Sequence, residues 1–366
     1  MTTTRTAMCA ALAVLLQAGV APVTAEDAVP QQAETPGPHF FEGLEGLKIG
    51  GLWYLSGQYT EGSSQVLVKR AYIDVHKTIL RWGETYFEGR ITPDVHQDGT
   101  GDLKVRLKYA YGKLTWKGVG FEPWMELGVV HMPWLDFEEH VNLYRMQDTM
   151  FVERIATLNS ADFGVTVGGF LGAKIDGPRS YPGRYGSFAL SLLDGGGYHT
   201  AEANSNKVLE GRLSLRPLPD ALQGLQLSYF GLTGRGNTPL EPDWIVNLGM
   251  VSYEHDRGTL TATYYQGDGN QAGNAVDAEG NALSRKGYSF FGELRALSRR
   301  RLRFILRFDH FDPDTAVADD DQDRLIAGVG WDLGHENVFL LDYDRVSYQD
   351  AREPVNRFQL TLQVKF

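Results

Sequence analysis

The chain alternates apolar and polar residues over many stretches of about ten residues, the length of a tilted membrane strand. In 355–366, every second residue from Phe358 to Phe366 is apolar, and the residues between them are polar. The stretches 102–111 and 302–309 repeat the pattern with charged side chains on the polar face. After the N-terminal region, no apolar run approaches the ~20 residues that a membrane helix needs. The pattern therefore predicts strands, and the charged faces favour a membrane barrel over a β-sandwich.

Sixteen such segments can be counted, starting near residues 47, 65, 82, 102, 121, 161, 184, 206, 224, 243, 258, 286, 301, 323, 337 and 355. Connections after even-numbered segments are mostly short, whereas those after odd-numbered segments are mostly long and polar. This asymmetry is typical of outer-membrane barrels. We therefore predict an all-β, transmembrane antiparallel β-barrel of sixteen strands, or an even number within two of it. Its short turns would be periplasmic, its long loops extracellular, and its location the bacterial outer membrane.

The N-terminal region divides into two predicted parts. Residues 1–25 are interpreted as a signal peptide, because the mostly apolar run Ala7–Val20 precedes a small-residue cleavage pattern ending at Ala25. The run is too short for the alternative, an N-terminal anchor helix. Residues 26–43 are rich in Pro, Gln and Glu and are interpreted as a flexible periplasmic lead-in, which leaves 44–366 for the barrel.

Composition and motifs argue against other classes of protein. The chain has 35 Lys and Arg against 46 Asp and Glu, so the basic excess of a nucleic-acid binder is missing. We find no G-x-S-x-G, Walker A or H-E-x-x-H motif, and we expect no enzyme activity, no cofactor and no metal site. A hydrolytic barrel stays as an alternative through two local pairs, Asp94 with His96 and His310 with Asp312. The acidic residues between 312 and 323 are expected to form a solvated loop.

The alternation also assigns charges to the lumen. Because a charge facing lipid near the midplane costs about 2–4 kcal/mol, charged residues should point inward. Three adjacent segments would then line one wall with Arg70, Arg90, Lys104, Arg106 and Lys108, and the far wall would add Arg303 and Arg307. Fixed cations in a narrow aqueous pore attract anions. We therefore expect these residues to favour anions.

The longest connection, 133–160, follows the fifth segment, and a loop of this length in a compact fold is usually functional. Its charged residues include Asp136, Glu138, Glu139, Arg145, Glu153 and Arg154. If the carboxylates face the basic wall, the pore has a transverse field and weak selectivity. If Glu153 and Arg154 instead pair with the wall as braces, the lysines stay free and anions are favoured. Both alternatives remain open from the sequence.

This region also carries a family resemblance. Gly128, Pro133, the acidic pair Glu138–Glu139, the run Phe151–Arg154 and Gly164 resemble the phosphate-selective porin O/P family. The resemblance implies an outer-membrane, anion-conducting porin, often a homotrimer, whose third extracellular loop folds into the lumen and sets the constriction. The family's phosphate-binding residues have no residue-by-residue counterparts in this sequence.

The C-terminus resembles the signal read by the barrel-assembly machinery. Apolar residues at alternate positions lead to a terminal aromatic, and we assign the signal to Phe358, Leu360, Leu362, Val364 and Phe366. Aromatic residues near segment ends are expected to form girdles at the membrane interfaces, namely Trp53, Tyr59, Tyr109, Tyr111, Trp116 and Trp244. Outer-membrane lipid and lipopolysaccharide would then be the surroundings of the barrel.

These observations predict a porin for passive diffusion of small hydrophilic solutes, with a weak to moderate preference for anions such as phosphate. One alternative is a general-diffusion porin for neutral or mixed solutes, including sugars that would stack on lumen aromatics such as Tyr72 and Tyr86. A barrel enzyme and a partner-binding scaffold are the other two alternatives.

Overall fold

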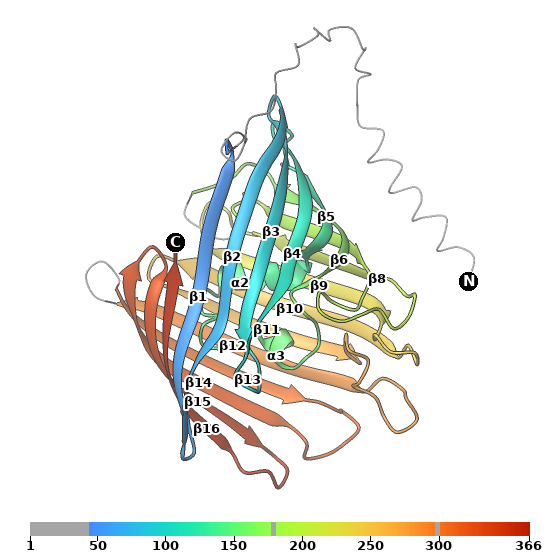
Figure 1. The fold of residues 1–366 in the computed structure, drawn as a ribbon, viewed down its shortest axis with the longest axis vertical. Helices are drawn as coiled ribbons and strands as arrows, with labels where there is room; N and C mark the ends of the chain where they lie inside the picture. The colour runs from blue at the N-terminus through green and yellow to red at the C-terminus, as the bar shows by residue number, and fades with distance from the viewer. Residues whose placement is uncertain (1–43, 177–180, 297–300) are drawn as a thin grey trace. The chain divides into compact units, whose positions relative to one another are not determined.

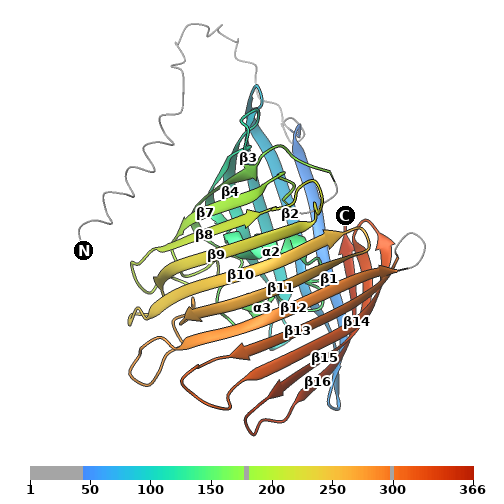
Figure 2. The same ribbon diagram turned by 180° about the vertical axis from the view of Figure 1, so that it is seen from behind.

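The computed structural model of the chain describes residues 44–176, 181–296 and 301–366. In these residues sixteen strands form one closed antiparallel barrel, in which β1 pairs with β16. Figures 1 and 2 show the ring of strands from opposite sides. The predicted signal peptide (1–25) and lead-in (26–43) lie outside the described residues.

The strands are β1 (Leu47–Thr60), β2 (Ser63–Trp82), β3 (Thr85–Gln97), β4 (Leu103–Trp116), β5 (Trp124–His131), β6 (Ala161–Leu171), β7 (Gly186–Leu193), β8 (Val208–Leu215), β9 (Leu225–Arg235), β10 (Asp243–His255), β11 (Gly258–Asp268), β12 (Ser284–Ala296), β13 (Leu302–Asp312), β14 (Gln322–Gly334), β15 (Asn337–Tyr348) and β16 (Val355–Lys365). The predicted strand number is confirmed, and every predicted start lies within three residues of the observed one.

Connections at the two ends of the barrel differ in length. One end carries the turns at 83–84, 256–257 and 335–336, together with longer connections such as 172–185. The other end carries long connections at 132–160, 194–207 and 269–283, although β1 and β2 are joined there by the short turn 61–62. We call these the short-turn end and the long-loop end.

Two helices occur in the connection between β5 and β6, which we call the inserted segment (residues 132–160). They are α2 (Pro133–Val141) and α3 (Phe151–Arg154). Pro133 occupies the first turn of α2, where its missing N–H is not needed for an intrahelical bond. Figures 1 and 2 both show the helices within the ring of strands. Among the residues described, neither helix is long and apolar enough to cross a membrane.

Side chains on β13 show how the strands separate lipid from lumen. Phe304 and Leu306 are exposed on the outer face, whereas Arg303, Ile305 and Arg307 are buried on the inner face. The outer face therefore suits hydrocarbon, and the inner face can hold charges that pair with one another. The C-terminal strand follows the same pattern, because Phe358 and Leu360 are exposed and Gln359 is buried.

A β-bulge changes this alternation on β4. The pairing of β3 with β4 shifts between Thr92 and Pro93, so Tyr109 follows the inward-facing Lys108 into the barrel. Tyr109 and Tyr111 are buried beside Arg90 instead of forming a girdle, and Trp244 is also fully buried. The girdle prediction is wrong for these three aromatics.

Two girdle candidates on β1, Trp53 and Tyr59, are exposed on the outer face, while Trp116 on β4 is partly buried. The terminal residue closes the ring beside one of them. Phe366 and Gly51 exchange two backbone hydrogen bonds of 3.0 and 3.1 Å, and the Phe366 ring packs edge-on against Trp53 at 5.8 Å. A Cβ at position 51 would lie 2.5 Å from the Phe366 ring, so a larger residue there would displace the ring. The role of the last strand in assembly remains a prediction.

Replacing Leu306 by Arg tests the assignment of the lipid face. The substitution should lower the free energy of unfolding by about 2–4 kcal/mol, because it places a charge in hydrocarbon. Ser284→Arg, at the exposed long-loop end of β12, should cost about 1 kcal/mol or less. Urea unfolding in lipid vesicles, followed by tryptophan fluorescence, measures both. Equal costs for the two variants would contradict the assignment.

Candidate functional site

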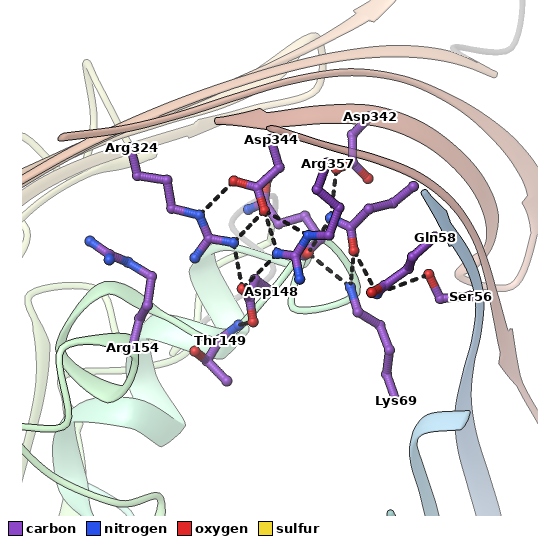
Figure 3. Close-up of polar contacts among 12 residues, drawn as sticks. Ser56, Gln58, Lys69, Asp148, Thr149, Arg154, Arg324, Asp342, Asp344 and Arg357 are labelled. Carbon is purple, nitrogen blue, oxygen red and sulfur yellow. Dashed lines mark hydrogen bonds and ion pairs between the residues drawn. The ribbon is translucent and has the colours of Figure 1, made fainter. Parts of the chain in front are cut away.

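Asp148 ties the inserted segment to the barrel wall. Its carboxylate lies 2.5 Å from Arg324 Nη2 and 3.4 Å from Arg357 Nη2. Both arginines also bind Asp344 on β15, as Figure 3 shows. Burial raises the pKa of Asp148, but the charges of Arg324, Lys69 and Arg357 outweigh burial and hold it well below its usual range. These ion pairs fix the middle of the inserted segment against β14–β16.

Lys69 reaches the same segment because of a second bulge. The pairing between β1 and β2 shifts register next to Lys69, and both Lys69 and Arg70 point into the barrel. The Lys69 ammonium donates to the carbonyl oxygens of Met146 at 2.8 Å and Gln147 at 2.9 Å. Strict alternation would place Lys69 on the lipid side, which is why the sequence prediction omits it.

Arg154 ties the end of the inserted segment to β13. Its Nε lies 3.0 Å from Asp309 Oδ2, and Arg307 binds the same carboxylate at 2.8 Å. Arg307 also donates to the Thr149 carbonyl oxygen at 2.8 Å. Arg154 is therefore a brace to the wall. Further anchors are the bonds from the Tyr144 hydroxyl to Glu293, from Arg285 to the Ile155 carbonyl and from Arg212 to the Pro133 carbonyl.

The other predicted residues of the inserted segment make different contacts. Glu153 pairs with Arg145 at 2.6 Å rather than with the wall, and Arg145 Nε also lies 3.1 Å from Glu139 Oε1. Asp136 accepts a hydrogen bond from the Tyr181 hydroxyl. Glu138 is buried and accepts a 2.8 Å bond from Trp134 Nε1. The brace alternative thus holds for Arg154, whereas Glu153 braces the segment internally.

Three of the predicted wall cations pair with carboxylates of neighbouring strands. Arg70 and Arg106 share Asp94, at 3.2 and 2.9 Å. Arg90 lies 2.5 Å from Asp74. The charges of these three arginines are therefore partly neutralised within the wall. The alternation of apolar and polar residues does not reveal this pairing.

The two lysines of this wall differ. Lys104 is 61% exposed in its side chain and pairs with Asp98 at the long-loop end. Lys108 is buried, and its ammonium lies 4.7 Å from the Tyr72 ring centroid and 5.2 Å from that of Tyr109. Among the described residues no carboxylate forms an ion pair with Lys108. Aromatic faces hold a cation in place without neutralising it.

The two predicted arginines lie on the far wall, and both form ion pairs with carboxylates there. Arg303 binds Glu293 at 2.9 Å and also contacts Asp332, and Arg307 binds Asp309 as described above. Six of the seven predicted wall cations lie on the inner face, Lys104 is exposed at the long-loop end, and among the described residues Lys108 is the one of the seven without an ion pair.

Two chambers are lined mainly by β1–β8 and the inserted segment, and a third, of about 550 Å³, lies between that segment and β12–β16. The long-loop chamber has a volume of about 700 Å³, and its charged lining comprises Lys69, Arg70, Arg145 and Arg357 against Asp98 and Asp148. The short-turn chamber has a volume of about 540 Å³, and its charged lining comprises Arg90, Lys113, Lys117, Lys174 and Arg212 against Glu88, Glu122, Glu126 and Asp136. Cations exceed carboxylates by two in the first chamber and by one in the second.

Lys108 lines neither of these two chambers. Along β2, Arg70 lines the long-loop chamber and His76 lines the short-turn chamber, while Tyr72 between them lines neither. Lys108 and Tyr109 also line neither chamber and are buried. Buried side chains, Lys108 among them, therefore lie between the parts of this wall that line the two chambers.

Solved structures with the same architecture are bacterial outer-membrane channels. OmpF of Salmonella typhi, in complex with daunomycin, matches with a TM-score of 0.62 at 12% identity, over 87% of this chain and 97% of OmpF. The trimer form of Vibrio cholerae OmpT matches at 0.58 and 12%, over 87% and 99%. The Acinetobacter baumannii channel DcaP matches at 0.58 and 13%, over 87% and 97%.

The fold is that of a bacterial outer-membrane porin. No protein-family model matches the sequence, and a search of curated proteins finds no relative. The structural comparisons establish the porin fold, and the more specific O/P family expected from 128–164 is not confirmed by them.

Several lumen residues of this porin fold are absent from the sequence prediction. Arg324 and Arg357 lie at inward positions that alternation identifies, although the sequence prediction does not name them. The sequence does not show which cations Asp74, Asp94 and Asp344 bind, because pairing depends on the register between strands.

The buried carboxyl group of Glu138 predicts a pH effect. Burial raises its pKa to about 7 from its ordinary 4.5. Between these values the folded protein keeps a proton that the unfolded chain releases, so this group lowers stability as the pH rises through that window. Glu138→Gln should therefore raise the free energy of unfolding at pH 8 by about 1–3 kcal/mol and change it little at pH 4.5. Urea unfolding at both pH values measures the effect. The exposed Glu353→Gln is the control, and a gain that is equal at both pH values would contradict the assignment.

Proposed function

We propose that this chain is a passive outer-membrane channel for small hydrophilic solutes, with a modest preference for anions. The long-loop end is extracellular and the short-turn end periplasmic in this proposal. The observation that carries the preference is Lys108, a buried inner-face lysine that contacts two aromatic rings and has no ion pair among the described residues. The excess of two cations in the long-loop chamber acts in the same direction.

The arrangement supports modest rather than strict selectivity. Arg70, Arg90 and Arg106 are paired with Asp94 and Asp74, so much of the basic wall contributes little net field. Phosphate is one permeant anion in this proposal, on the basis of the resemblance in 128–164. The porin fold and the resemblance also favour a homotrimer, and one comparison structure is the trimer form of OmpT.

A second candidate function is diffusion of neutral or mixed solutes, including sugars. The rings of Tyr86, Tyr111 and Trp124 line the short-turn chamber, where sugars could stack. An enzymatic role has less support from the two local pairs, because Asp94 is bound by two arginines and His310 pairs with Asp323 at 2.8 Å rather than with Asp312.

The reversal potential of single channels in a KCl gradient tests the proposal. The wild-type protein should give an anion-selective potential, and Lys108→Met should lower the chloride-over-potassium permeability ratio by about threefold or more. Methionine keeps most of the side-chain volume and removes the charge. Lys104→Gln should change the ratio little, because Lys104 is exposed at the mouth and already paired.

An unchanged ratio in Lys108→Met would remove the role given to this residue. A wild-type potential near zero would favour the second candidate function. The absence of openings from correctly folded protein, recognised by its heat-modifiable migration in gels, would leave an enzyme or a partner-binding scaffold.

A further inference from the structure

Arg212 on β8 is a buried cation that has no ion-pair partner among the described residues. It is 2% exposed, and its guanidinium donates to the Pro133 carbonyl oxygen at 3.2 Å, Ser187 Oγ at 3.0 Å and Ser214 Oγ at 2.7 Å. Within the described part of the chain no carboxylate forms an ion pair with it. A buried charge is costly unless an opposite charge compensates it. Arg212 therefore has capacity to bind an anion.

Asp136 is the carboxylate that acts electrostatically on Arg212, but its polar contacts are to other residues. Its carboxylate accepts a hydrogen bond from the Tyr181 hydroxyl. It also lies 3.7 Å from His131 Nε2 and 3.7 Å from His140 Nδ1. Asp136 thus acts on Arg212 through space without occupying its guanidinium.

Aromatic rings surround the Arg212 guanidinium. Its Cζ lies 4.4 Å from the Phe137 ring centroid and 4.8 Å from the Tyr181 ring centroid. The Tyr181 ring is 6.3 Å from that of Phe170. Arg212, Tyr181 and Phe170 all line the short-turn chamber, whose volume of about 540 Å³ is in the range of small-molecule sites.

We propose that the short-turn chamber binds a small aromatic carboxylate, with its carboxylate on Arg212 and its ring against Tyr181 and Phe170. Nε and Nη1 of Arg212 are already hydrogen-bonded, so Nη2 is the group that would donate to the carboxylate, and aromatic rings pair favourably edge-to-face or offset. Inorganic phosphate would compensate the charge of Arg212 but would make no ring contact with Tyr181 and Phe170. This inference rests on the proposed channel function and names a substrate class for it.

Benzoate is the probe, added to wild-type channels in planar bilayers while chloride current is recorded. Acetate lacks the ring and benzyl alcohol lacks the charge. Benzoate should interrupt the current at a concentration at least tenfold lower than either comparator. Arg212→Met should raise the half-blocking concentration of benzoate at least tenfold, and Tyr181→Leu should remove the advantage of benzoate over acetate.

Arg216→Met is the matched control. Arg216 follows β8, is equally buried, binds the carbonyl oxygens of Gln223 and Gly183, and does not line the chamber. Its benzoate block should equal that of the wild type. If Arg212→Met does not fold, Arg212→Lys keeps the charge but removes the Nη2 donors, and it should raise the half-blocking concentrations of benzoate and acetate alike.

Equal block by benzoate and acetate in the wild type would overturn the inference, as would an unchanged benzoate block in Tyr181→Leu. The KCl reversal potential, recorded in the same bilayers, reports on the proposed function separately. Anion selectivity without preferential benzoate block overturns only the binding site. Benzoate block in a cation-selective channel overturns only the anion preference.

Discussion

Closure of the sheet is the constraint on which the rest of the structure depends. In hydrocarbon every backbone N–H and C=O must be bonded within the protein, and an open sheet edge would leave a row of them unpaired. Pairing of β1 with β16 removes both edges. Once the ring is closed, alternation forces one face of each strand toward lipid and the other into a shared interior, where charges gather close enough to pair.

The inserted segment is not attached equally to all sides of that interior. The inserted segment is tied to the β12–β16 side through Asp148, Arg154 and Tyr144, and to β2 through Lys69. The long-loop and short-turn chambers are lined mainly by β1–β8 and the inserted segment, and a third chamber of about 550 Å³ lies between that segment and β12–β16. Because most arginines of the lumen are paired, their main contribution is to hold the segment and the strands in place. In our proposals Lys108 and Arg212, which contact aromatic rings and have no ion pair among the described residues, are the charges that act on solutes.

The sequence predicts the fold well, because the period-two pattern reports directly on burial between lipid and lumen. It locates the inserted segment by length and the wall cations by parity. It fails where a bulge changes the parity, as at Lys69, Tyr109 and Tyr111. It also fails to identify pairing partners, since the contact of Arg70 and Arg106 with Asp94 depends on inter-strand register and rotamers that no local pattern encodes.

The most direct test of a path along one wall is thiol accessibility. In a Cys9→Ser background, single cysteines at Gln65 and Glu88 report on the two chambers, and cysteines at Ser252 and Thr261 report on the buried opposite wall. A charged methanethiosulfonate reagent is added during current recording. The account predicts rapid current changes for the two chamber positions and none for the other two. Equal modification on both walls would contradict it.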